Sequence, residues 1–140
     1  MKIRIETYEG ISATPALPLA VEGWHELIKR KLADDQMIFN WDSNALVAFV
    51  GKKPVGVLLW AKIEWQKRAY VNLGYVQPDY RRRGIYRQLF AGLVEKAREA
   101  KLREIQGITY TKNSALRKFA GIRGAQGIRC CADFPCGRLR

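Results

Sequence analysis

The spacing of apolar positions changes several times along the chain, and each change predicts a new element. Apolar and polar residues alternate over 2–7, which is typical of a half-exposed strand. Apolar residues then recur at helical spacing over 21–32. Pro15 and Pro18 precede this stretch and are expected to break the chain, so the helix should begin after them.

Three apolar runs then follow one another, with only short turn sequences between them. Their residues are 45–50, 55–64 and 69–76. Such short connections indicate an antiparallel meander. Strict alternation in the third run would place Val71, Leu73 and Tyr75 on one face of the sheet. Asn72 and Gly74 would then lie on the other face.

The second half of the chain returns to helical spacing and then alternates between strand and helix patterns. From Tyr86 onwards the apolar residues form one stripe of a helix. The stretch 104–110 has the pattern of a strand, and 114–123 that of a short helix. A last strand beyond Gly127 would complete the order β, α, β-β-β, α, β, α, β.

Length and composition favour one folded domain over residues 1–140. The chain is 48% hydrophobic and long enough to bury a core. No apolar run approaches the roughly 18 residues that span a bilayer, and the N-terminal residues lack the apolar core of a signal peptide. We therefore expect a cytoplasmic protein with no membrane partner.

Three cysteines, Cys130, Cys131 and Cys136, lie close together near the end of the chain. An odd number of cysteines in a chain of this kind argues against a disulfide framework. The one histidine, His25, is far away in the sequence, so we expect no metal site. Reduced structural thiols are the favoured interpretation, with a redox or metal role as the alternative.

The net charge of +12 is concentrated in the C-terminal half. Residues 1–76 carry 10 basic and 8 acidic groups, whereas residues 77–140 carry 15 and 5. This asymmetry predicts an anionic partner, either a nucleic acid or an anionic cofactor. It argues against a polycationic substrate such as an aminoglycoside or a polyamine, because like charges would repel it.

Three consecutive arginines and a glycine, at 81–84, join a predicted strand to a predicted helix. The first N–H groups of a helix lack intrahelical partners and carry partial positive charge, so an anion can bind there. A glycine at this point lets the backbone approach a phosphate closely. The pattern predicts a phosphate or pyrophosphate site, with a plain charged turn as the alternative.

The stretch from Val76 to Tyr86, followed by Leu89, resembles the acyl-CoA loop of the GNAT superfamily of N-acyltransferases. The family form is an apolar strand end, x-Pro, a tyrosine or similar residue, and then Gln/Arg-x-x-Gly-x-Gly/Ala. The meander opened by Pro54-Val55-Gly56 and the later stretch 113–119 resemble the family order as well. The resemblance implies an α+β GNAT fold, with a mixed, mostly antiparallel central sheet flanked by helices.

The resemblance also implies how acetyl-CoA would be held. Backbone groups at Tyr75, Val76 and Pro78 would meet the pantetheine arm, in a gap where two strands diverge. The pyrophosphate would be wrapped by the loop, whose residues are Arg81, Arg82, Arg83, Gly84, Ile85 and Tyr86. Asn113 would contact the cofactor arm, with a helix N-cap as its alternative role, and Phe119 would pack beside the arm. Tyr86 departs from the family pattern, which has glycine or alanine there.

The catalytic groups are harder to assign, because the strand before the loop contains no carboxylate and no histidine. Acyl transfer to an amine needs a base, and an acid or oxyanion donor helps the thiolate to leave. Glu64 is the one carboxylate favoured as the base, with an exposed strand-end charge as the alternative. Asn72 could hold a water instead, and Tyr110 offers a nearby hydroxyl. The later helix has Phe119 and Ala120 where family members carry an acidic tyrosine.

Three functions follow from these patterns. The first is an acetyl-CoA-dependent N-acetyltransferase that transfers acetyl directly to a primary amine of a protein or small molecule. The second is a catalytically degenerate GNAT-fold module that binds CoA or a partner. The third is a basic nucleic-acid-associated protein, and an acetyltransferase acting on a nucleic-acid-bound protein would combine the first and third. Monomer and homodimer both stay open.

Overall fold

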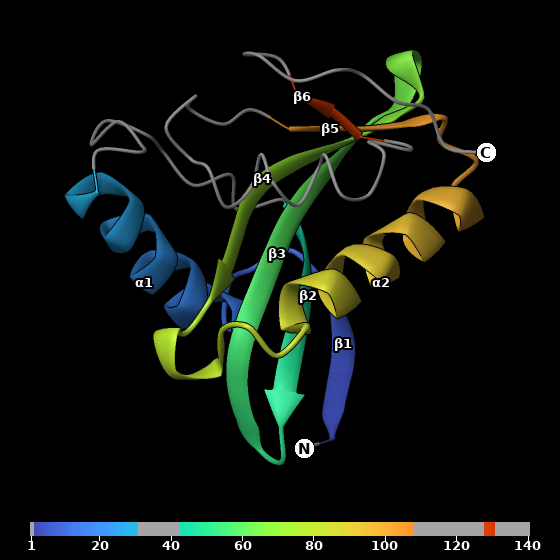
Figure 1. Ribbon diagram of the computed structural model, residues 1–140. Coiled ribbons are helices and arrows are strands. Elements are labelled where there is room, and N and C mark those ends of the chain that lie inside the picture. The colour runs from blue at the N-terminus through green and yellow to red at the C-terminus, as the bar shows by residue number, and fades with distance from the viewer. Residues whose placement is uncertain (1, 31–42, 108–127, 131–140) are drawn as a thin grey trace.

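A six-stranded sheet in the order β1-β2-β3-β4-β5-β6 forms the centre of the protein (Figure 1). The computed structural model describes residues 2–30, 43–107 and 128–130. The elements are β1 (Ile3–Glu9), α1 (Ala16–Lys29), β2 (Asn44–Val50), β3 (Lys53–Ile63), the 3-10 turn η1 (Glu64–Gln66), β4 (Arg68–Val76), the 3-10 turn η2 (Pro78–Tyr80), α2 (Ile85–Glu99), β5 (Glu104–Gly107) and β6 (Ile128–Cys130). Strands β1 to β4 pair antiparallel, and β5 and β6 add to the sheet in parallel. The predicted mixed, mostly antiparallel sheet flanked by helices is thereby confirmed.

Both faces of the sheet are covered, because α1 and α2 pack on opposite sides of it. Leu89 and Leu93 of α2 belong to one buried cluster with Leu46 and Leu58 of the sheet. The helix α1 contributes to a second cluster with the alternate residues of β2 and β3; its members include Leu19, Trp24, Ala45, Val47, Val57 and Leu59. Strands buried on both faces need apolar residues at nearly every position, which explains the unbroken apolar run over 45–50.

The helix α1 begins at Ala16, before the point that the prolines suggested. Pro15 is the N-cap residue, with φ of −61°, and Pro18 lies within the first turn. The first backbone N–H groups of a helix have no intrahelical acceptor, so a proline there costs little. The Ala16 N–H also donates to the Thr14 hydroxyl oxygen at 3.3 Å. The prediction that Pro18 breaks the chain was therefore wrong.

An irregularity in β4 changes which face its side chains occupy. Leu59 of β3 pairs with Leu73, and Trp60 pairs with Val71, so Asn72 is an extra residue in β4. Such a bulge disturbs the alternation of side chains along a strand. Val71 accordingly packs with the α2 cluster, whereas Leu73 belongs to the α1 cluster. The prediction of strict alternation through this strand was wrong at this point.

The bulge also lies where the described pairing between β4 and β5 stops. That pairing runs from Arg68↔Glu104 to Val71↔Gly107. Residues 72–76, which we call the open end of β4, have no described strand partner on the β5 side. We call residues 68–71 the paired end. The predicted strand at 104–110 and the last strand beyond Gly127 are both present in the parts described, as β5 and β6.

The predicted helix at 114–123 lies outside the described residues. Within the ranges that the structure describes, no helix is long and apolar enough to cross a membrane.

Candidate cofactor-binding site

The loop between β4 and α2 has the backbone form of an anion cradle. Two successive turns of the chain are left-handed, at Arg82 with φ of 64° and at Gly84 with φ of 77°. Gly84 is the N-cap of α2, and no side chain caps this helix end. The first N–H groups of α2 are therefore available to an anion, which the helix dipole also favours. Glycine at 84 adopts its left-handed backbone without a Cβ penalty.

The three arginines of the loop play different structural roles. The Arg81 side chain turns inwards: its Nε donates to the Val76 carbonyl oxygen at 2.8 Å. Its terminal guanidinium nitrogen pairs with Glu26 of α1 at 2.5 Å. Arg82 and Arg83 are exposed, and the Arg83 guanidinium lies 5.7 Å from the centre of the Tyr80 ring. Arg81 therefore ties the loop to α1, while Arg82 and Arg83 remain at the surface.

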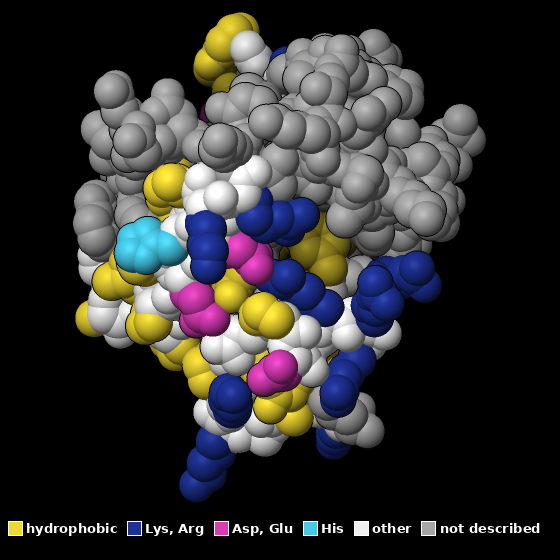
Figure 2. Space-filling model, turned by 60° about the vertical axis from the view of Figure 1, so that its left-hand side comes forward, with side chains coloured by type: hydrophobic (Ala, Val, Ile, Leu, Met, Phe, Trp, Pro, Cys, Tyr) yellow, Lys and Arg dark blue, Asp and Glu magenta, His cyan; other side chains and the backbone are white. Residues whose placement is uncertain are grey.

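Acidic side chains of α1 complete the surroundings of Arg81. The Tyr75 hydroxyl donates to Glu22 at 2.8 Å, and the Arg81 guanidinium lies 5.6 Å from the centre of the Tyr75 ring. Burial raises the pKa of Tyr75 well above its ordinary value, and the hydrogen bond to Glu22 raises it further. On the face that carries α1, acidic and basic side chains are interspersed rather than gathered by sign (Figure 2). The network joins α1, β4 and the loop into one unit.

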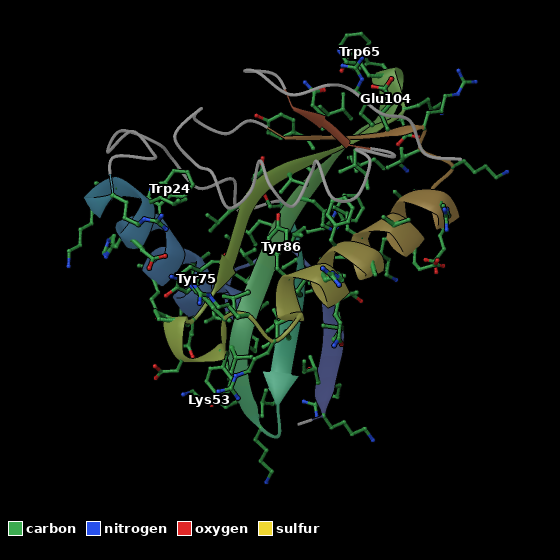
Figure 3. The ribbon with its side chains drawn as sticks, viewed as in Figure 1. Trp24, Lys53, Trp65, Tyr75, Tyr86 and Glu104 are labelled. Atoms are coloured by element: carbon green, nitrogen blue, oxygen red, sulfur yellow. The ribbon has the colours of Figure 1, made fainter. Side chains whose placement is uncertain are left out.

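Two contacts between a glycine and a tyrosine hold the open end of β4 from both sides. On the α1 side, a Cβ at Gly23 would lie 2.6 Å from Cγ of Tyr75. On the α2 side, a Cβ at Gly74 would lie 3.0 Å from the hydroxyl oxygen of Tyr86 and closer still to its ring. Figure 3 shows the two tyrosines on either side of the strand. Only glycine lets each ring approach so closely.

The residues predicted to meet the pantetheine arm lie in this same region. The Tyr75 side chain is buried in the α1 cluster, so its backbone is what it can present to a ligand. The Val76 carbonyl oxygen accepts from Arg81, and the Gln77 N–H donates to the Val55 carbonyl oxygen at 2.9 Å. Pro78 begins the exposed turn η2. The structure therefore brings Tyr75, Val76 and Pro78 next to the arginine loop.

The catalytic candidates are separated by the fold. Glu64 lies in η1, beside the start of β4, and β4 spans roughly 26 Å between Arg68 and Val76. Lys62 bonds its carboxylate at 2.9 Å, and this hydrogen bond lowers the pKa of Glu64. A carboxylate with a lowered pKa is a weaker base, so both position and charge oppose a role for Glu64 at the loop.

Asn72, by contrast, lies at the bulge that begins the open end of β4. Its Nδ2 donates to the hydroxyl oxygen of Ser43 at 2.8 Å. Ser43 is buried, so it fixes the amide of Asn72 in place. Tyr110, Asn113 and Phe119 lie outside the described residues.

No metal-binding group is found in the parts of the chain that the structure describes: no three His, Cys, Asp or Glu side chains are suitably grouped. Cys131 and Cys136 lie outside those parts.

Comparison with known proteins assigns the family. The model of the acetyltransferase (GNAT) family matches residues 9–124, so the chain belongs to this family. The match includes both helices, the open end of β4 and the arginine loop. A search of the curated proteins finds no match.

Solved acetyltransferase structures share the fold at low sequence identity. The ribosomal-protein-alanine N-acetyltransferase from Brucella melitensis biovar Abortus 2308 is 20% identical, with a TM-score of 0.66 over 99% of both chains. The aminoglycoside acetyltransferase meta-AAC0020, from an uncultured soil metagenomic sample, is 15% identical, with a TM-score of 0.66 over 86% of both chains. AAC(6')-Iy, in complex with a bisubstrate analog of CoA, is 14% identical, with a TM-score of 0.69 over 100% of this chain and 99% of the other. At these identities the likeness shows the fold alone.

Proposed function

We propose that the protein transfers the acetyl group of acetyl-CoA directly to a primary amine of a protein or small molecule. The observation that carries this proposal is the loop at 81–84, with its two left-handed residues and its uncapped helix start, beside the open end of β4. Membership of the acetyltransferase (GNAT) family supports acetyl-CoA as the acyl donor.

The loop residues fit the anionic part of this donor. In the proposal, the N–H groups of Ile85 and Tyr86 bind the pyrophosphate above Gly84, and Arg82 and Arg83 add charge-assisted bonds from the surface. Arg81 acts indirectly, since its guanidinium is already engaged by Glu26 and by the Val76 carbonyl oxygen. Its role is to hold the loop against β4.

The open end of β4 suits the uncharged part of the donor. The pantetheine arm would lie along the backbone at Tyr75, Val76 and Pro78, in the space beyond the last described pair of β4 and β5. An extended chain can pair with an unpartnered strand edge through main-chain hydrogen bonds. The thioester would then lie towards the bulge at Asn72.

The reaction requires one proton to leave the amine and one to reach the sulfur. The amine nitrogen bonds to the carbonyl carbon, the carbon–sulfur bond breaks, and its electron pair stays on the sulfur. In the proposal, the Asn72 amide, held by Ser43, orients a water that takes the proton of the amine. Tyr110, Asn113 and Phe119 keep the roles that the family resemblance implies for them.

The acceptor is an amine that the charge of the protein does not repel. The excess of basic groups in residues 77–140 disfavours a polycation. It favours an amine carried by an anionic molecule or by a protein bound to nucleic acid. This charge is the observation that keeps a nucleic-acid-associated role as the second candidate.

Calorimetry with acetyl-CoA, CoA and pantetheine tests the donor site. The double variant Arg82→Ala/Arg83→Ala should weaken CoA binding about tenfold or more and leave pantetheine binding unchanged, because only CoA carries the pyrophosphate. Arg98→Ala removes an exposed arginine from the far end of the same helix and serves as the matched control. Equal losses for CoA and pantetheine would contradict the assignment of the arginines.

A thiol-release assay over a panel of amines then tests the chemistry. Turnover with any primary amine supports the enzyme. Binding of acetyl-CoA with no turnover would indicate a degenerate binding module. Absence of acetyl-CoA binding together with salt-sensitive binding of nucleic acid would indicate the third function.

A further inference from the structure

Tyr86 is the one loop residue that departs from the family pattern, and the structure shows where its side chain goes. It lies in the first turn of α2 and packs against the α2 cluster. Its hydroxyl oxygen would be 3.0 Å from a Cβ at Gly74, so the phenol lies directly on the backbone of β4. The bulky side chain is therefore accommodated by a glycine on the facing strand.

This contact brings the hydroxyl to the part of β4 where the proposed chemistry occurs. Gly74 is in the open end of the strand, two residues or about 7 Å from Asn72 at the bulge. The Tyr86 side chain is only partly buried, so a ligand along this edge can reach it. Figure 3 shows Tyr86 between the start of α2 and β4.

The leaving thiolate needs a proton donor, and the later helix has no hydroxyl at 119 or 120 to supply one. A phenol with a pKa near 10 is protonated at neutral pH and can donate. Tyr80, the other tyrosine nearby, instead lies under Lys53, whose ammonium is 5.1 Å from its ring centre. Tyr86 is thus the described phenol that lies on the open end of β4 from the α2 side.

We propose that Tyr86 protonates the sulfur of CoA as it leaves. This inference rests on the proposed function. As the nitrogen–carbon bond forms, the carbon–sulfur bond breaks, and the phenol proton moves to the sulfur. The proton released by the amine, carried through water, restores the phenol, so that protons and electrons balance over one turnover.

The first test separates the hydroxyl from the ring. Tyr86→Phe keeps the ring over Gly74 and should bind acetyl-CoA within about twofold of wild type, while kcat falls about 100-fold, the lower range for a general acid. Tyr80→Phe is the matched control and should leave kcat unchanged. An unchanged kcat in Tyr86→Phe would overturn the proposal. So would a large gain of acetyl-CoA affinity in Tyr86→Ala, since the ring would then be an obstruction.

A second measurement does not depend on turnover. Binding of CoA should perturb the ultraviolet absorbance of a tyrosine in the wild-type protein, and Tyr86→Phe should abolish that change. A tyrosine signal that CoA binding leaves unaltered would overturn the proposal even if no acceptor amine is found. Absence of turnover in the wild-type protein, with the CoA-induced signal present, would instead count against the proposed function and leave Tyr86 as a CoA contact.

Discussion

The two ends of β4 are held in different ways. At the paired end, hydrogen-bonded strands flank the chain on both sides, and Arg68 pairs with the buried Glu104 at 2.8 Å. The Arg68 guanidinium also donates to Gln106 of β5 at 3.0 Å. At the open end, the described contacts on the β5 side are replaced by side chains that pack on the two faces, chiefly Tyr75 and Tyr86.

This difference has a functional reason. A strand that is paired on both sides has used its main-chain groups, so the paired end is a rigid support. The open end is stabilised by side chains, and its backbone edge can therefore be used to bind a ligand. Binding sites commonly occupy regions with fewer main-chain constraints than the elements that support them.

The largest expected effect breaks the paired end. Glu104→Ala leaves Arg68, which is mostly buried, without its carboxylate and should reduce the free energy of unfolding by about 3 kcal/mol. Denaturant unfolding measures this. Glu64→Ala removes an exposed carboxylate from the adjacent turn and should have no measurable effect. Similar results for the two variants would contradict the difference between the buried and exposed pairs.

The next effect is at the α1 side of the open end. Gly23→Ala gains about 1 kcal/mol of helix propensity, but its Cβ would lie 2.6 Å from Cγ and 2.7 Å from Cβ of Tyr75. These atoms are next to the backbone of β4 and cannot rotate away, so overpacking of about 2–3 kcal/mol should exceed the gain. We expect a lower unfolding midpoint. His25→Ala, on an exposed position of the same helix, is the control, and a stabilised Gly23→Ala would show that α1 is loosely docked.

A smaller effect is expected on the α2 side, because the Tyr86 ring can move. Gly74→Ala should cost about 1 kcal/mol and displace the ring. In the background of Tyr86→Ala the same change should cost almost nothing, so a double-mutant cycle should give a coupling of roughly 0.5–1 kcal/mol. Strict additivity would mean that Gly74 and Tyr86 are not in contact in solution.

The smallest effect is a pH dependence at Tyr75, the residue with the raised pKa. Its hydroxyl stays protonated in the folded protein when the unfolded chain would ionise, so its contribution is complete below about pH 10 and is lost as the pH rises further. Stability measured at pH 8 and above pH 10 should fall less in Tyr75→Phe than in wild type. Parallel losses would mean that Glu22 does not hold the hydroxyl.

Much of the fold could be predicted from local patterns. Runs of alternating or continuous apolar residues located the strands, and the stripe after Tyr86 located α2. The order of elements and the loop at 81–84 were sufficient to indicate the GNAT fold, and the family match confirms it. The start of α1 was missed because a proline in the first turn has the same sequence signal as a proline that ends a helix.

The candidate site was less predictable than the fold. Nothing in the spacing of the three arginines distinguishes Arg81, which pairs with Glu26, from Arg82 and Arg83 at the surface. The partner lies 55 residues away, on a helix whose acidic residues look like an ordinary solvated face. The bulge at Asn72 is equally silent in the sequence, because it depends on the register with β3.

The sequence by itself therefore determined the elements, their order and the position of the anion loop, because these depend on residues that are close along the chain. The tertiary structure decided which arginine faces α1, which face each side chain of β4 occupies, and that Tyr86 lies on Gly74. Each of these is a contact between segments far apart in sequence, and it arises only when both helices pack on the sheet.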